Sequence, residues 1–171
     1  MKRATMLATC IGAMISTGAL AQVPVPAAQD HDHHQMVIDV TSLNWVDAVG
    51  LPKGAEAAPV FGDIKKPGEL YVIRTRGGPY WKLPPHTHPF KFQIFTVIEG
   101  SVAMRAGTKF EQDDKYLVGP GSVLIHPGDV PHYLWTGPQG VVLQIMGIGP
   151  GVGIDYVNPA DDPRNQANAS K

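Results

Sequence analysis

Cysteine is almost absent from this sequence. The one cysteine, Cys10, lies within the first 21 of the 171 residues, a segment that we expect to be removed. The mature chain would then contain no thiol. This excludes disulfide bonds, thiolate catalysis and cysteine-based zinc sites from the mature protein.

Charge is sparse as well, since Asp, Glu, Lys and Arg make up 17% of the chain. Loss of Lys2 and Arg3 with the first 21 residues would leave 12 of the 14 basic residues against 15 acidic ones, a net charge of −3. Nucleic-acid binding requires clustered Lys and Arg, and the sequence has no such cluster. We therefore expect no nucleic-acid partner.

The segment 1–21 has the three parts of a secretory signal peptide. Lys2 and Arg3 are positive, residues 4–20 are uncharged and mostly apolar, and Ala19-Leu20-Ala21 is a small-residue cleavage site. A retained membrane anchor is the alternative, but the apolar stretch is short and contains Thr, Ser and Gly. We predict cleavage after Ala21, a periplasmic or extracellular location, and no stable membrane anchor after processing.

Helical periodicity is lacking in the rest of the chain, whereas turn residues are frequent. The chain has 19 glycines and 16 prolines, many of them between short apolar runs. Runs rich in β-branched and aromatic residues between such turns are typical of an all-β sandwich or barrel. The expected strands are 70–76, 92–99, 102–105, 123–126, 132–135 and 141–148.

This pattern predicts one β-domain over residues 40–164. Residues 22–39 are expected to be a flexible leader and residues 165–171 a disordered tail. The leader contains His31, His33 and His34. These histidines are either part of a solvated tail or a device that captures metal ions.

Two histidines, His86 and His88, stand just before a strong strand. Side chains at i and i+2 of an extended segment point the same way, so both imidazoles can bind one ion. On the strand 92–99, Gln93 shares a face with Phe95, which places an amide among apolar side chains. A buried amide needs a partner, and a metal ion would be one. A later turn returns the chain so that His132 opens a new strand.

These residues follow two motifs, and with them the sequence resembles the cupin superfamily. The first motif, G-x5-H-x-H-x3,4-E-x6-G, is matched at His86, His88 and Gly100, where a tight strand-to-strand turn is expected. The second, G-x5-P-x-G-x2-H-x3-N, is matched at its first glycine, its proline and its histidine: Gly121, Pro127 and His132. The resemblance spans roughly residues 40–164. Within the superfamily the sequence is similar to small secreted single-domain cupins, and the resemblance implies a jelly-roll-like β-barrel.

Four positions depart from the family's pattern. The first-motif glycine has no clean counterpart, because Gly77 and Gly78 lie two or three residues too early. Gln93 stands at the glutamate ligand, Asp129 at the second-motif glycine, and Thr136 at the final asparagine. The amide oxygen of Gln93 can still bind a divalent ion, but it brings no charge. The site would therefore carry one more positive charge than the family's version, which favours an anionic ligand.

The resemblance implies one divalent metal ion on His86, His88 and His132, with Gln93 as a fourth ligand. The ion could be iron, manganese, nickel, copper or zinc. The implied function is a metal-dependent enzyme, either dioxygenase-like or a Lewis-acid isomerase or lyase, acting on a small oxygenated organic molecule. The alternative is a non-catalytic periplasmic module that binds a small molecule or a metal.

Other residues carry weaker expectations. Arg74 could point into the barrel as an anion clamp or be paired on its outer face. Trp81 could line the ligand pocket together with Phe95, or simply pack in the core. His126 alternates away from the expected metal face, which predicts a loop or surface position. Phe90 and Phe92, beside the histidines, could make the mouth of the barrel apolar or take part in a homodimer contact.

The first testable prediction concerns export. We expect material purified from the native host to begin at Gln22, because the positive segment, the apolar run and the cleavage site occur together. Intact-mass measurement and N-terminal sequencing check this. A full-length product in the cytoplasm would contradict it.

Overall fold

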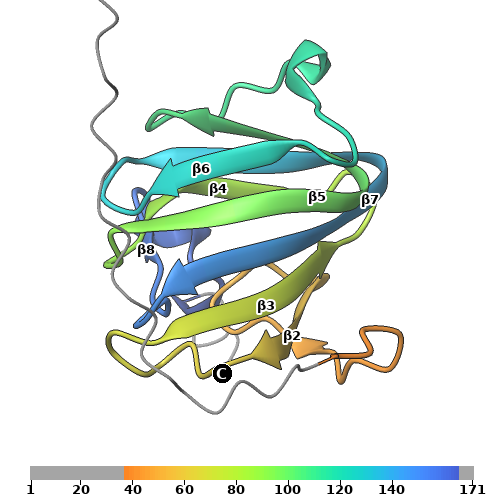
Figure 1. Cartoon of the computed structure of the whole chain (residues 1–171). Coiled ribbons are helices and arrows are strands. Elements are labelled where there is room, and N and C mark those ends of the chain that lie inside the picture. The colour runs from red at the N-terminus through yellow and green to blue at the C-terminus, as the bar shows by residue number, and fades with distance from the viewer. Residues whose placement is uncertain (1–36, 166–171) are drawn as a thin grey trace, which may run out of the picture. The chain divides into compact units, whose positions relative to one another are not determined.

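Eight antiparallel strands form one curled sheet in the computed structural model, which describes residues 37–165 (Figure 1). The predicted signal peptide, and almost all of the predicted leader and tail, lie outside the described residues. The strands are β1 Val46–Asp47, β2 Ala55–Phe61, β3 Leu70–Gly77, β4 Lys82–Thr87, β5 Phe92–Ala106, β6 Val123–Pro127, β7 His132–Ile148 and β8 Asp155–Tyr156. Two short 3-10 turns, η1 Asp114–Tyr116 and η2 Pro159–Asp161, complete the described elements. The prediction of an all-β domain is confirmed.

The two long strands, β5 and β7, pair with each other along most of their length. The sequence predicted each of them as two shorter strands, and the tight turn expected at Gly100 was wrong. Gly100 and Gly140 instead have φ values of 71° and 70°, which glycine adopts without strain. The chain therefore bends at these glycines, with register shifts in the ladder, and the strands continue.

The inner face of the sheet holds the main apolar core. Strand alternation turns every second residue of β5 and β7 to this face, among them Phe95, Val97, Leu143 and Ile145, which are all buried. A second cluster, built on Tyr133 and Trp135, packs on the other face of β7. Strand β7 begins at His132, and near this end the two clusters cover both of its faces.

Arg74 does not point into this core. Its neighbour Ile73 packs against the core cluster, so strand alternation turns the Arg74 side chain to the outer face. In the sheet its backbone is aligned with Ala58 on β2 and Gln144 on β7. An anion clamp inside the barrel is therefore wrong for Arg74. On the outer face its Nε atom is buried without a hydrogen-bond partner among the described residues, and pairing of the Arg74 guanidinium there stays a prediction.

Strand β4 contains the two prolines that the sequence suggested as a turn. Pro84 and Pro85 lie between Leu83 and His86, and the ladder to β7 is irregular over this interval. Proline has no N–H to donate, so it is tolerated where a ladder is interrupted. The irregularity lets the strand continue to His86.

The outer face of the sheet exposes several large apolar side chains on β3, β5, β6 and β7: Leu70, Phe92, Val123, Ile125 and Ile148. A homodimer contact that uses Phe92 stays a prediction. Between residues 37 and 165, no helix is long and apolar enough to cross a membrane.

Candidate metal centre

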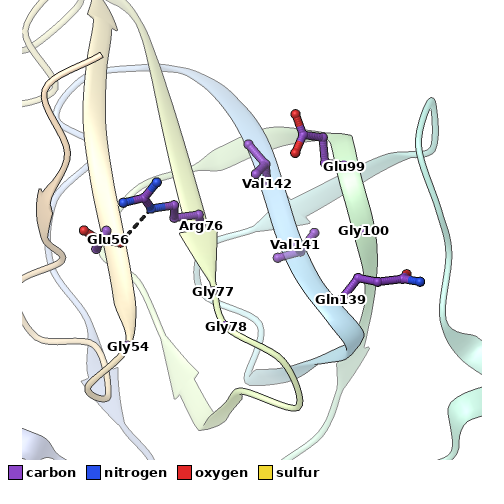
Figure 2. Close-up of a pocket in the computed structure, with 10 residues that line it drawn as sticks. All are labelled: Gly54, Glu56, Arg76, Gly77, Gly78, Glu99, Gly100, Gln139, Val141 and Val142. Carbon is purple, nitrogen blue, oxygen red and sulfur yellow. Dashed lines mark hydrogen bonds and ion pairs between the residues drawn. The ribbon is translucent and has the colours of Figure 1, made fainter. Parts of the chain in front are cut away.

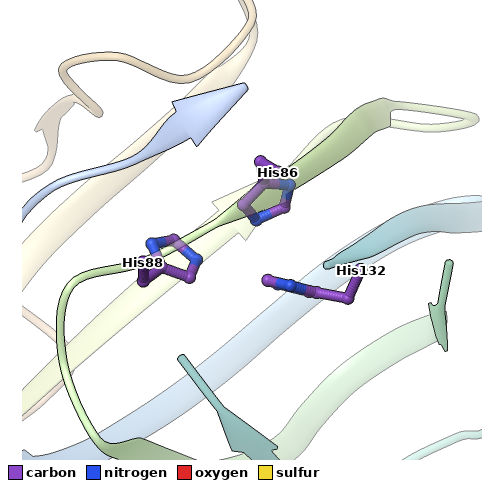
Figure 3. A group of neighbouring side chains, drawn as sticks. All are labelled: His86, His88 and His132. Atoms are coloured by element: carbon purple, nitrogen blue, oxygen red, sulfur yellow. The ribbon is translucent and has the colours of Figure 1, made fainter. Parts of the chain in front are cut away.

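Three histidines meet where β4 lies against the start of β7. Backbone pairing aligns His86 on β4 directly with His132 on β7, and His88 follows one residue after β4 ends. One nitrogen from each of the three lies within 4.8 Å of the others. Figure 3 shows the three imidazoles turned toward one another. The structure thus brings together the three histidines that the sequence singled out.

Each of these imidazoles is fixed by a backbone carbonyl. His86 Nδ1 lies 2.7 Å from the oxygen of Pro84, His88 Nδ1 lies 2.7 Å from the oxygen of Gly153, and His132 Nδ1 lies 3.2 Å from the oxygen of Val130. A carbonyl oxygen can only accept, so each Nδ1 carries the hydrogen. The lone pair of each neutral ring is therefore on Nε2, the atom left free for a metal ion.

Two loops hold His88 in place. Its backbone N–H donates to the oxygen of Gly128 at 2.8 Å, and a β-carbon at Gly128 would overlap the backbone oxygen of Phe90. This close approach requires glycine. The second loop, 149–154, supplies the Gly153 carbonyl to the His88 ring. The sequence had suggested only a turn-rich segment there.

His126 is a fourth histidine of the cluster, and the prediction of a loop or surface position was wrong. It lies on β6 and is buried, with its ring centroid 3.5 Å from that of His132 and 5.7 Å from that of His88. The error came from the alternation argument, because residue 126 directly faces Gln93 across β5 and β6 and shares its inward face. Its Nε2 atom is buried without a hydrogen-bond partner among residues 37–165.

Burial keeps the cluster neutral. It lowers the pKa of His86 to about 3, of His126 to about 4 and of His132 to about 2, since desolvation disfavours the charged ring. The neighbouring imidazoles lower these pKa values further by like-charge repulsion. Burial also lowers the pKa of His88. Neutral imidazole is the form that binds metal ions.

Gln93 is buried on β5, on the same inward face as His126. Its Nε2 donates to the hydroxyl oxygen of Tyr71 at 2.6 Å and to the carbonyl of Gly151 at 3.4 Å. Tyr71 was not predicted from the sequence, although it lies two residues before Ile73 on an alternating strand and therefore points to the inner face of the sheet. The role of Gln93 as a metal ligand stays a prediction.

Aromatic rings surround the cluster. Phe90 stacks on His88 with ring centroids 4.5 Å apart, and Phe95 meets His126 edge-on at 6.4 Å. Trp81 lies elsewhere: it packs against the core, and its indole N–H donates to the carbonyls of Pro52 and Lys53. The simpler expectation of core packing describes Trp81 better than a wall of the ligand pocket.

A hollow of about 330 Å³ lies at the bend of the sheet (Figure 2). Glu56 and Arg76 form an ion pair at 2.6 Å on its wall. None of the four clustered histidines lines it, and glycines make up much of its surface. The histidine cluster is therefore separate from this hollow.

The donor set fits a divalent metal ion. His86 Nε2 is buried without a hydrogen-bond partner among the described residues, a costly arrangement unless another group binds it. Three converging neutral imidazoles suit iron, nickel, copper or zinc. The residues that would hold the ion are therefore His86, His88 and His132.

The curled antiparallel sheet and the histidine cluster define the chain as a cupin. The model of the family described as AraC-like ligand binding domain matches residues 69–157, more than half of the chain. This protein belongs to that family. A search of the curated proteins gave no match.

Solved structures agree with the cupin fold. The polyketide cyclase RemF from Streptomyces resistomycificus is 20% identical, with a TM-score of 0.61 over 79% of this chain and 94% of that one. KdgF from Halomonas sp. is 15% identical, with a TM-score of 0.52 over 68% and 96%. A cupin-like protein from Thermotoga maritima is 16% identical, with a TM-score of 0.52 over 72% and 93%. At these identities the similarity shows the fold alone, and the jelly-roll-like cupin barrel is confirmed.

The lowered pKa values predict how the metal-free protein responds to acid. Below pH 6.5 the histidines of the unfolded chain bind protons, whereas His86, His126 and His132 of the folded chain stay neutral. The unfolded state then binds more protons, so the free energy of unfolding falls as pH falls from 6.5 to 5, by up to about 1.4 kcal/mol per pH unit for each histidine. Urea unfolding of metal-free protein at a series of pH values measures this.

Most carboxylates stay ionised between pH 6.5 and 5, so the histidines dominate the pH dependence in this window. A variant with His86, His126 and His132 replaced by Asn serves as the control and should show a shallower slope. Equal slopes in the two proteins would contradict the buried, neutral cluster.

Proposed function

We propose that this chain is an exported metal-dependent cupin enzyme that acts on a small, anionic, oxygen-bearing organic molecule. The observation that carries the proposal is the geometry of His86, His88 and His132, whose Nδ1 atoms are hydrogen-bonded to carbonyls, so that each neutral ring has its lone pair on Nε2. Export rests on the composition of segment 1–21 alone.

In this proposal the ion is held by the three Nε2 atoms, with the amide oxygen of Gln93 as a fourth ligand. All four donors are neutral, so the charge of the ion is not compensated by its ligands. Asp155 acts on His88 and Asp129 on His126, but only as more distant charges. A site of this charge favours an anionic oxygen ligand over a neutral one.

A bound divalent ion would act as a Lewis acid on such an oxygen, or as a binding site for dioxygen. The side chains of this chain orient the ligand and limit water. Phe90 and Phe95 present apolar surface beside the histidines. The Nε2 of His126, which has no partner among residues 37–165, offers a polar contact next to His132.

Similar structures support the proposal that this chain is an enzyme, but they support no particular reaction. One is titled a polyketide cyclase, and another, 16% identical with a TM-score of 0.51, is titled the DMSP lyase DddQ from Ruegeria pomeroyi DSS-3. The fold supports many chemistries, so no substrate is transferred from them.

A non-catalytic periplasmic binding module is the second candidate, favoured by the ligand-binding description of the family and by Gln93 in place of a carboxylate. Metal analysis combined with assays on a panel of small oxygenated acids separates the two. Turnover, with or without oxygen consumption, supports the enzyme. Saturable binding of an acid without turnover supports the module.

The metal site has its own test. Replacing His86, His88 or His132 by Ala should remove most of the bound metal after dialysis, because each change deletes one of three Nε2 donors. Inductively coupled plasma mass spectrometry measures metal per chain. Replacing His31, His33 and His34 together is the matched control and should leave the cupin site loaded.

Metal retained at one equivalent by the triple variant of His86, His88 and His132 would place the site elsewhere. In that case the proposal of metal-dependent catalysis at this cluster would be withdrawn.

A Gln93→Glu change tests the fourth ligand. It adds a negative charge beside the ion and should tighten metal binding by roughly 1–2 kcal/mol. Part of the gain is offset by desolvation of the carboxylate and by the Gly151 carbonyl, which then faces an oxygen instead of the amide nitrogen. Binding of an anionic ligand should weaken at the same time. Titration calorimetry with Zn²⁺ measures the first effect, and an unchanged affinity would leave three histidines as the only protein ligands.

A further inference from the structure

A row of residues crosses the sheet beside the histidine cluster. Backbone pairing aligns Tyr71 with Gly147, Gly147 with Gln93, and Gln93 with His126, across β3, β7, β5 and β6. Residues aligned in this way share one face of a sheet. His126 is in ring contact with His132. The row therefore leads from Tyr71 through Gln93 to the histidine cluster.

Tyr71 occupies a slot that two glycines leave open. Its side chain is fully buried, and a β-carbon on Gly147 or on Gly151 would overlap its hydroxyl group. The slot directs the hydroxyl to Gln93, whose Nε2 donates to it at 2.6 Å. A short hydrogen bond between two buried groups fixes the position of the amide.

The Gly151 carbonyl determines which end of the amide faces Tyr71. A tyrosine hydroxyl can donate or accept, so Tyr71 alone would tolerate either end. A carbonyl only accepts, and the oxygen of Gly151 lies 3.4 Å from Gln93 Nε2. With the amide reversed, two oxygens would face each other in a buried place. The amide nitrogen of Gln93 is therefore held at Tyr71 and Gly151. Its oxygen, Oε1, then points away from these two residues.

We propose that Tyr71 is a positioning residue which, with the Gly151 carbonyl, keeps the amide oxygen of Gln93 turned toward the metal. This rests on the proposed function, because it takes the metal site as given. It also explains why a glutamine at position 93 needs partners that fix its orientation. A carboxylate presents an oxygen whichever way it is rotated, whereas an amide has one oxygen and must be held the right way round.

A double-mutant cycle tests this proposal with Co²⁺ as the probe. The four proteins are the wild type, Tyr71→Phe, Gln93→Glu and the double variant, all with His31, His33 and His34 replaced by Ala so that only the cupin site is measured. Calorimetry gives the Co²⁺ affinity, and the visible absorption of Co²⁺ reports its coordination. Tyr71→Phe should weaken binding about tenfold, as the loss of a partner that orients a ligand does.

In the Gln93→Glu proteins a carboxylate oxygen faces the Gly151 carbonyl, but this cost is the same with and without the Tyr71→Phe change and cancels in the cycle. In that background Tyr71→Phe should cost less than about threefold, because a carboxylate presents an oxygen to the ion in either orientation. The Co²⁺ spectrum should change with Tyr71→Phe only when residue 93 is glutamine. Tyr133→Phe is the matched control: it removes a buried tyrosine hydroxyl that donates to the backbone oxygen of Glu111 on the other face of β7. Its Co²⁺ affinity should equal that of the wild type.

Equal losses in both backgrounds would mean that Tyr71 supports the sheet rather than the amide, and would overturn the proposal. So would a Gln93→Ala variant that binds Co²⁺ as the wild type does, although the three-histidine site would stand. A wild type that binds no Co²⁺ would overturn the proposed function itself.

A measurement on the unchanged protein guards against a Tyr71→Phe variant that fails to fold. In the wild type the side-chain amide hydrogens of Gln93 are donated to Tyr71 and Gly151, so they should exchange slowly with solvent. Nitrogen-15 NMR, with the resonance identified by its proximity to the Tyr71 ring, reports the rate. Exchange as fast as that of exposed glutamines would overturn the proposal.

Discussion

The hydrogen bond from histidine Nδ1 to a backbone carbonyl is the constraint on which the candidate site depends. It is made three times, by His86, His88 and His132, and each time the acceptor is main chain. Main-chain acceptors are held by the fold, so the tautomer and the ring orientation are fixed before any ligand arrives. Strand β4 supplies one of these acceptors at Pro84, and the loops around Val130 and Gly153 supply the other two. The turn-rich sequences of the two loops do not reveal this role.

Burial is the second constraint on the site, because it keeps the imidazoles neutral. A cluster of four imidazoles would repel itself if protonated, and desolvation lowers the pKa values of its members so that the rings stay neutral. Within the described part of the chain, the Nε2 atoms of His86 and His126 have no hydrogen-bond partner. This is the cost of the arrangement, because buried polar atoms normally have partners. Such unpaired atoms are expected where a fold is shaped for a ligand rather than for stability.

The sequence predicted the parts of the site that follow from spacing. His86 and His88 at i and i+2, and His132 after a turn, could be placed because alternation and two motifs locate them. It did not predict His126 or Tyr71, whose positions depend on register between strands far apart in the chain. It divided β5 and β7 into four strands for a related reason. Gly100 and Gly140 mark bends in the structure, and sequence alone does not distinguish a bend from a turn.

The central claim is that one metal ion is held by three Nε2 atoms inside this cupin. Anomalous diffraction from crystals grown with Zn²⁺, measured at the zinc absorption edge, tests it most directly. The account predicts one strong peak about 2.0–2.1 Å from Nε2 of His86, His88 and His132. No peak at this cluster, or a peak bonded to Nδ1 atoms, would contradict it.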